Sequence, residues 1–296
     1  MSPKARLTTR NETPHVGIVI PVWNSRELTL ACLESVYQLD YASAIVTIVD
    51  NGSSDMTSEV VRERYPEIHI IRNEENLGFA RACNQGMMWC FAQGADHVLL
   101  LNNDTSLDAN MLARLVDAAE QYPEAGIFGP RIGYADDPSS PWFTGYRFKR
   151  DFYIVRTSDP RHLVQANCPA SVDFISGCGM LVTRKLFEAI GGFHEQYFMY
   201  YEDIDYCLTA KQHGFDVMYI PHARMCHEVS ASSGGKNSVR KQVEQVKSCW
   251  VFCRRHTKGL SRWINMGVRV GHAVYVTAFG PRKRTRSNPP TEVSPR

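Results

Sequence analysis

Short apolar segments rich in β-branched residues alternate with helix-length segments over residues 16–121, and this alternation restricts the folds open to the chain. Strands are predicted at residues 16–22, 45–49, 68–71 and 97–101. Helices are predicted after Ser25, which is a suitable N-cap, and at about 56–65, 78–93 and 107–121. Strands separated by helices of this length form βαβ units, so we predict an α/β fold with a mostly parallel central sheet flanked by helices.

The chain is less regular in its second half. Residues 134–170 have weak periodicity and several prolines and glycines, and a loop of this length is uncommon unless it shapes a site. Regular structure returns with a predicted strand over 172–183, helices over 184–190 and 202–213, and a strand over 217–220.

Polar clusters follow two of the predicted strands. Residues 50–55 come directly after the second strand, and residues 102–105 come directly after the fourth. In open α/β sheets, ligands bind beyond the carboxyl ends of the strands, so we expect the two clusters to share one crevice. Ordinary turn chemistry is the alternative for either cluster alone, because Asp, Asn, Gly and Ser all favour turns.

The chain has neither of the common glycine-rich phosphate loops, GxGxxG and GxxxxGK[ST]. A diphosphate site would therefore need another source of positive charge, and a divalent cation held by a carboxylate at a strand end supplies one. Mg²⁺ and Mn²⁺ prefer oxygen ligands and often use one or two protein groups together with substrate phosphates. Asp104 is the best candidate ligand, because it follows an apolar strand and has no basic neighbour in the sequence.

Three carboxylates lie among aromatic residues at 202–205. On a helix, Glu202 and Asp205 share one face and Asp203 points elsewhere. Acidic residues are also favoured at helix starts by the exposed N–H groups, which is the alternative to a sugar-binding site here. His227 follows a predicted strand, but a lone histidine is more often structural than a ligand, and His222 would compete with it for any role.

Eight short motifs occur in a fixed order between residues 16 and 227, and the ordered set is far more specific than any one motif. In chain order they are IVIPVWN (18–24), VDNGSSD (49–55), NLGFA with NQG (76–86), LNNDT (101–105), GCGMLV (177–182), GGF (191–193), YEDID (201–205) and His227. The set resembles the family 2 glycosyltransferases of the GT-A fold, in particular the bacterial rhamnosyltransferase-like members. The resemblance implies a Rossmann-like GT-A domain followed by a C-terminal helical extension.

The resemblance also implies a role for each matching residue. Asp203 matches the catalytic base, and Asp104 and His227 match the ligands of a divalent metal ion, Mg²⁺ or Mn²⁺. Asn102 replaces the first aspartate of the DxD position, which leaves one carboxylate there for the metal. The residues implied in nucleotide-sugar binding are Pro21, Asp50, Gly78, Arg81, Asn103 and Asp104. The residues implied on the acceptor side are Gly177, Cys178 and Glu202.

The reaction implied by the resemblance is an inverting glycosyl transfer in surface polysaccharide biosynthesis. The donor would be a UDP- or dTDP-linked sugar, with rhamnose as one candidate, and the acceptor a glycan or lipid-linked hydroxyl. A catalytically silent sugar-nucleotide-binding partner or scaffold is the alternative, and the joint presence of Asp104, Asp203 and His227 argues against it. A nucleotidyltransferase would need a glycine-rich, arginine-containing loop after the first strand, which residues 21–24 do not supply.

The motifs divide the chain into four predicted regions. A flexible arm (1–14) precedes a GT-A domain (15–235), whose nucleotide-sugar-binding half covers 15–133 and whose acceptor and catalytic half covers 134–235. A basic amphipathic helical extension (236–280) and a disordered tail (281–296) follow.

Charge is unevenly distributed along the chain. Residues 235–296 carry 14 Lys and Arg against two acidic residues, whereas residues 1–234 carry 19 basic against 29 acidic residues. Basic residues and tryptophan along 238–280 favour peripheral contact with a membrane, and a helix packed on the catalytic domain with a solvated basic face is the alternative. We expect no nucleic-acid partner, because no recognition motif accompanies the charge.

The remaining composition predicts where the protein resides. The first 15 residues lack the apolar core of a secretory signal, and no run of 18 apolar residues occurs. The nine cysteines include no CxxC pair and are predicted to be reduced thiols. These features predict a cytoplasmic protein, located at the inner face of the cytoplasmic membrane if the basic segment binds lipid.

Overall fold

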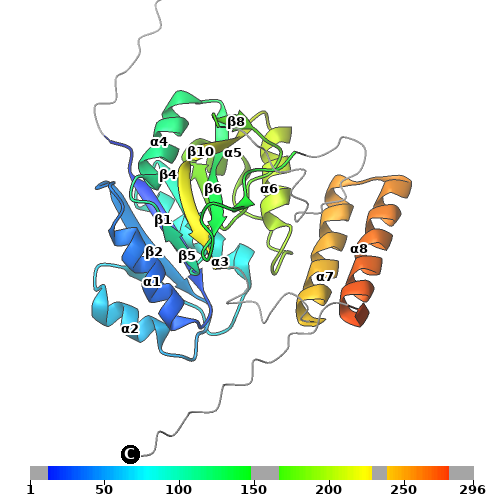
Figure 1. Cartoon of the computed structure of the whole chain (residues 1–296), viewed down its shortest axis with the longest axis horizontal. Coiled ribbons are helices and arrows are strands. Elements are labelled where there is room, and N and C mark those ends of the chain that lie inside the picture. Colours follow the sequence, from blue (N-terminus) through cyan, green and yellow to red (C-terminus); the bar gives the residue numbers. More distant parts are fainter. Residues whose placement is uncertain (1–12, 148–166, 229–238, 280–296) are drawn as a thin grey trace, which may run out of the picture.

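One mixed sheet of ten strands organises the described part of the computed structural model, which comprises residues 13–147, 167–228 and 239–279 (Figure 1). The main strand order is β3-β2-β1-β4-β9-β6-β10-β5, with β7 beside β6 and β8 beside β10. The strands are β1 (Val16–Val22), β2 (Ala44–Asp50), β3 (His69–Arg72), β4 (His97–Leu101), β5 (Thr105–Leu107), β6 (Ala125–Tyr134), β7 (Pro141–Phe143), β8 (Ala170–Ser171), β9 (Gly179–Thr183) and β10 (Asp216–His227). The helices are α1 (Arg26–Tyr37), α2 (Thr57–Arg64), α3 (Phe79–Ala92), α4 (Met111–Gln121), α5 (Arg184–Ile190), α6 (Glu202–Gln212), α7 (Val239–His256) and α8 (Gly259–Phe279). The predicted α/β class is confirmed.

β1 is the centre of the parallel half of the sheet. It pairs in parallel with β2 on one side and β4 on the other, and β2 pairs in parallel with β3. The register places Val22 opposite Asp50, so the residues that follow β1, β2 and β4 lie along one edge. This is the arrangement that the two polar clusters predicted.

Helix α3 lies against β1 at very close range. A Cβ atom on Gly86 would lie 2.2 Å from the Val19 side chain, so only glycine permits this approach of helix and strand. The contact fixes the start of α3, at Phe79, near the edge where the parallel strands end.

β9 reverses the direction of the sheet. It runs antiparallel to β4, with Gly179 opposite Leu101 and Thr183 opposite His97. The strand predicted over 172–183 is therefore confined to its last five residues. Because β9 begins where β4 ends, residues 176–178 lie beside Asn102, whose N–H donates to the Cys178 carbonyl at 3.1 Å.

β10 is three times as long as the strand predicted at 217–220, because it continues through Pro221 to His227. Its pairing with β6 shifts register between Ile220 and Arg224, and an irregularity of this kind accommodates a proline that cannot donate a ladder hydrogen bond. The sequence predictions also missed β6 and the short strands β5, β7 and β8. Of the predicted excursion over 134–170, residues 148–166 lie outside the described residues.

Two C-terminal helices form a hairpin in which α7 lies between α8 and the rest of the molecule (Figure 1). The Ser248 hydroxyl of α7 donates to the Met199 carbonyl at 2.7 Å, and the Phe252 ring packs on Tyr201 with centroids 5.5 Å apart. These contacts join α7 to the turn that precedes α6. The predicted disordered tail (281–296) and most of the predicted arm (1–14) lie outside the described residues.

Asp205 connects α6 to α7 in the interior. Its Oδ1 accepts hydrogen bonds from the Tyr197 hydroxyl at 3.1 Å, from Arg255 Nε at 2.6 Å and from His256 Nε2 at 2.6 Å. Burial alone would raise the pKa of Asp205, but the hydrogen bonds from His256 and Arg255 outweigh it and hold the pKa below its usual range.

All nine cysteines lie among the described residues and are free thiols, seven of them buried. None of the helices in the described ranges combines the length and the apolar character needed to cross a bilayer.

We predict that Asp205→Ala lowers the free energy of unfolding by about 3 kcal/mol, because it leaves Arg255 and His256 without their acceptor. Urea denaturation at neutral pH measures the loss. The depressed pKa of Asp205 means that its contribution is present above about pH 4 and disappears as the pH falls below that value. Glu120→Ala, at an exposed position of α4, is the control and should cost less than about 0.5 kcal/mol. Equal losses in the two variants would contradict this account.

Candidate active site

Asp104 and His227 meet at the edge where the strands end. His227 Nε2 lies 3.0 Å from Asp104 Oδ1, and both residues are buried. Backbone pairing holds them together, because His227 lies opposite Thr105 in the β10–β5 ladder and the Glu228 N–H donates to the Asp104 carbonyl at 2.8 Å. His222, the competing histidine, is exposed on β10.

The predicted divalent cation fits this pair. Burial alone would lower the pKa of the His227 ring, but Cys178 and Asp104 outweigh it and raise the pKa to about 10. The ring must lose its proton to ligate a metal, so a cation would replace that proton between the two side chains. In the described ranges no group of three or more His, Cys, Asp and Glu suited to a metal occurs.

The turn before β9 connects this pair to Asp203. The Gly177 N–H donates to Asp203 Oδ2 at 3.0 Å, and the Cys178 thiol interacts with His227. The Asp203 Oδ1 accepts a second backbone hydrogen bond, from Ile204 at 2.9 Å. One short turn therefore contacts both the candidate metal ligands and the candidate base.

The three carboxylates of α6 have different environments, as the helical spacing predicted. Asp203 is partly exposed, whereas Glu202 and Asp205 are buried. Burial raises the pKa of Asp203 to about 6, which leaves this carboxylate ionised at neutral pH. Burial and the charge of Asp203 raise the pKa of Glu202 well above its usual range, and Glu202 Oε2 has no hydrogen-bond partner among the described residues. Asp203 is thus the group able to accept a proton at the surface of the site.

The turn that leads into α6 is strained. Tyr200 and Tyr201 have φ values of 72° and 71°, in the left-handed region that residues other than glycine rarely adopt. Contacts with α7 cover the turn, since Phe252 packs on Tyr201 and the Lys241 ammonium lies 5.6 Å from the centroid of the Tyr200 ring. The start of the helix that carries Asp203 therefore depends on α7.

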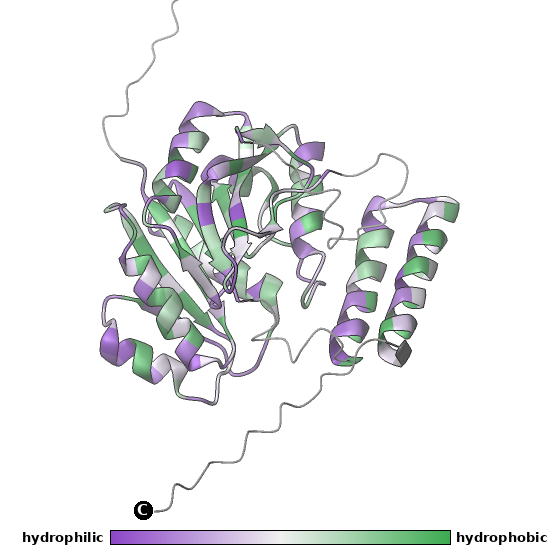
Figure 2. Ribbon diagram, viewed as in Figure 1, coloured by the Kyte–Doolittle hydropathy of each residue, from purple (hydrophilic) through white to green (hydrophobic). Residues whose placement is uncertain are grey.

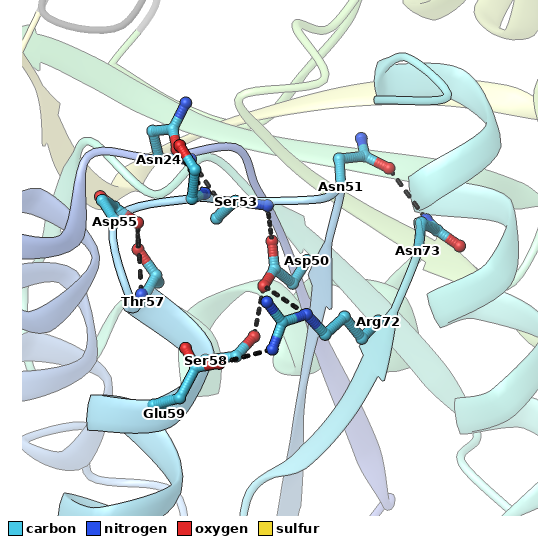
Figure 3. Close-up of polar contacts among 11 residues, drawn as sticks. Asn24, Asp50, Asn51, Ser53, Asp55, Thr57, Ser58, Glu59, Arg72 and Asn73 are labelled. Atoms are coloured by element: carbon cyan, nitrogen blue, oxygen red, sulfur yellow. Dashed lines mark hydrogen bonds and ion pairs between the residues drawn. The ribbon is translucent and has the colours of Figure 1, made fainter. Parts of the chain in front are cut away.

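On the side predicted to bind the donor, Asp50 organises the loop that follows β2 (Figure 3). Asp50 is fully buried, and its oxygens accept hydrogen bonds from the Ser53 N–H at 2.8 Å and from the Ser58 hydroxyl. Arg72 Nε lies 3.9 Å from Asp50 Oδ2. These contacts direct the carboxylate into the protein, and the predicted contact between Asp50 and a nucleotide remains a prediction.

The loops after β1 and β2 are held together by side chains that Figure 3 displays. Asn24 Oδ1 accepts from the Ser54 N–H at 2.9 Å, and the Asn24 N–H donates to the Ser53 hydroxyl at 2.8 Å. The Asp55 carboxylate accepts from the N–H of Arg26, the first residue of α1. This network of side-chain and backbone groups fixes the shape of the strand ends.

The other residues predicted to bind the nucleotide sugar differ in their burial and their contacts. Pro21 is half-buried near the end of β1, and Gly78 precedes α3. Arg81 is exposed, with its Nε 3.6 Å from Glu195 Oε2. Asn103 is buried and donates to the Thr29 hydroxyl at 2.9 Å, which directs its side chain toward α1.

Trp142 was not foreseen from the sequence. It lies on β7, and its ring packs edge-on against His227 with centroids 4.5 Å apart. No periodicity marks residues 134–147, so only the pairing of β7 with β6 identifies Trp142 as a neighbour of the site.

The family model described as "Glycosyltransferase like family 2" matches residues 14–260 of the chain. Among curated proteins, N-acetylglucosaminyl-diphospho-decaprenol L-rhamnosyltransferase of Mycobacterium tuberculosis (strain H37Rv) is 28% identical over 240 residues, which cover 70% of this chain and 73% of that protein. The dTDP-rhamnosyl transferase RfbF of Shigella flexneri is 23% identical over 219 residues, covering 74% and 71%.

Among solved structures, the mannosyltransferase PcManGT from Pyrobaculum calidifontis, in complex with GDP-Man and Mn²⁺, superposes with a TM-score of 0.59 at 19% identity. The match covers 91% of this chain and 72% of that one. At this identity the likeness shows the fold alone, and it confirms the predicted GT-A fold.

We predict that Gly78→Ala destabilises the protein more than Gly94→Ala. Both glycines have φ near +90°, where an alanine is strained, and the ψ of 170° at Gly78 lies in a region that essentially only glycine adopts. At Gly78 the added Cβ would also lie 2.4 Å from the Phe198 carbonyl oxygen, whereas nothing lies within 4 Å at Gly94. We therefore expect Gly78→Ala to lose roughly 1–3 kcal/mol more of its free energy of unfolding than Gly94→Ala, as measured by urea denaturation. Identical urea midpoints for the two variants would contradict the effect of the contact with Phe198.

Proposed function

The chain belongs to glycosyltransferase family 2, and on that premise we propose that it transfers a sugar from a nucleotide diphosphate sugar to a hydroxyl group, with inversion at the anomeric carbon. Both relatives are named for rhamnose, and the name of the Shigella flexneri protein includes dTDP, so dTDP-rhamnose is the first donor to test and UDP is the other nucleotide. The diphospho-decaprenol in one of those names suggests a lipid-linked glycan acceptor. The biological setting we propose is surface polysaccharide biosynthesis.

The observation that carries the proposal is the turn over residues 176–178. It contacts Asp203 through the Gly177 N–H and lies against His227 through the Cys178 thiol. A proton acceptor and a candidate cation site thus lie at the same edge of the sheet. An inverting transfer needs this pairing, because a base must serve the acceptor while positive charge serves the leaving diphosphate.

Asp203 acts on the acceptor. A sugar hydroxyl is a poor nucleophile, so the Asp203 carboxylate accepts its proton as the new glycosidic bond forms. The hydrogen bonds from Gly177 and Ile204 fix both carboxylate oxygens. The side chain is therefore ordered before the reaction, and little rotational freedom is lost on reaching the transition state.

Asp104 and His227 act on the donor. They would hold Mg²⁺ or Mn²⁺, which would act as a Lewis acid and stabilise the negative charge of the leaving diphosphate. The Asp104–His227 pair is held by the β10–β5 ladder, so its geometry does not depend on the substrate. Trp142 packs on the His227 ring and limits its motion.

A panel of nucleotide sugars with Mn²⁺, Mg²⁺ or EDTA tests the proposal. We expect dTDP- or UDP-sugars to raise the melting temperature only when a divalent cation is present, since binding to the folded state stabilises by RT ln(1 + [L]/Kd). His227→Ala should abolish the cation-dependent rise in melting temperature. His222→Ala, on the exposed side of the same strand, should retain that rise. Binding of donors without any turnover in a panel of acceptors would favour a silent binding partner instead.

We predict that Asp203→Asn retains donor binding and slows transfer by about 10²–10⁴-fold, because the amide cannot accept the proton. In the wild type, the rate should fall as the pH is lowered through about 6, since Asp203 becomes protonated there and a base must be ionised. The control is Asp173→Asn, which alters a carboxylate near the other end of α6 that pairs with Lys211. Unchanged turnover of Asp203→Asn in an initial-rate assay would remove Asp203 from the mechanism.

A further inference from the structure

Helix α8 presents a stripe of large apolar side chains to solvent. At 3.6 residues per turn, the positions of the stripe residues all fall on one broad face of the helix. Their exposed fractions are 74% for Leu260, 64% for Trp263, 37% for Ile264, 37% for Val268, 61% for Val274 and 63% for Tyr275. We call these six residues the α8 stripe.

The opposite face of α8, toward α7, buries two polar side chains. Arg269 is buried, and its guanidinium donates to Gln242 Oε1 at 2.9 Å and to Gln245 Oε1. Asn265 is buried as well. A helix packed on a protein normally buries its apolar face, whereas α8 buries these polar groups beside Met266 and leaves its large apolar side chains exposed.

The α8 stripe extends onto α7 through an aromatic contact. Trp250 of α7 is 37% exposed, and its ring centroid lies 6.0 Å from that of Trp263. Hydrophobic residues recur along the α8 ribbon, at the outer side of the hairpin and away from the sheet (Figure 2). Large apolar side chains exposed together on one face in this way indicate an interaction site.

The positive charge near the α8 stripe favours an anionic partner. No acidic residue occurs between Glu244 and Glu292, while Lys247, Arg254 and Lys258 are exposed on α7 and at the turn of the hairpin. A second copy of the chain on this face would bring two sets of cations together, which is unfavourable. A surface of anionic lipid headgroups offers the opposite charge.

We propose that the α8 stripe docks in the interfacial region of an anionic lipid bilayer, with the helix axis parallel to the membrane plane. Tryptophan and tyrosine are the aromatic residues that favour this region, and both are in the stripe.

Docking through α8 would fix the orientation of the candidate site. Helix α7 is bonded to α6 through Arg255, His256 and Asp205, and α6 carries Asp203. A membrane-bound hairpin would thus hold the base at a constant distance from the lipid surface. Only this consequence rests on the proposed function, and the docking itself does not require it.

Co-sedimentation of the full chain with vesicles tests the docking in the absence of any substrate. The probes are phosphatidylcholine vesicles with and without phosphatidylglycerol. We expect binding to the anionic vesicles, weakened by salt, and at least a roughly tenfold lower partition coefficient for the double variant Leu260→Ser/Trp263→Ser. Met88→Ser, which removes an apolar residue that is 53% exposed on α3, is the matched control and should bind like the wild type.

Charge and self-association are separated by two further measurements. Arg254→Gln/Lys258→Gln should lower binding to the anionic vesicles by roughly tenfold or more. Failure of the wild type to bind anionic vesicles would overturn the proposal, as would equal binding by Leu260→Ser/Trp263→Ser. A dimer in sedimentation velocity that the double variant converts to monomer, with no vesicle binding, would assign the stripe to a second copy. Because no donor or acceptor is present, these results do not depend on transferase activity.

Discussion

β9 enters the sheet between β4 and β6 in the antiparallel direction, so its first residue lies beside the last residue of β4. The turn before β9 is thereby brought to the carboxyl edge of the parallel strands, where ligands bind in open α/β sheets. From that position its backbone reaches Asn102 on one side and Asp203 on the other. A parallel strand in the same place would end, rather than begin, at this edge, and the turn before it would lie at the opposite side of the sheet.

The elements predicted well from the sequence are those whose hydrophobic pattern matches their burial in the folded protein. β1 and β4 were predicted to the residue, because each is a short apolar run that is buried between neighbours. β6 escaped notice because glycines and Pro130 interrupt it, although a Cβ at Gly129 would lie 2.2 Å from the Ile175 side chain. β10 was cut short at Pro221 because a proline usually ends a strand, and only the pairing with β6 reveals the register shift that accommodates it.

The candidate site was less predictable than the fold, for a physical reason. Residue type and spacing separated the faces of α6, and the structure accordingly exposes part of Asp203 and buries Glu202. They could not reveal that Asp50 directs its carboxylate inward or that Trp142 packs on His227, since both facts depend on residues far away in the chain. His227 carried almost no signal of its own, because its proximity to Asp104 arises from the β10–β5 pairing.

The strained turn at Tyr200 and Tyr201 also affects the order in which parts of the protein fold during synthesis. Left-handed tyrosines persist only when surrounding structure holds them, and here that structure is α7, which follows them by about forty residues. A chain emerging from the ribosome exposes its N-terminal parts first, so the sheet and the donor-side loops can form before α7 has been synthesised. The helix that carries Asp203 would then take its final place last, once the hairpin of α7 and α8 is complete.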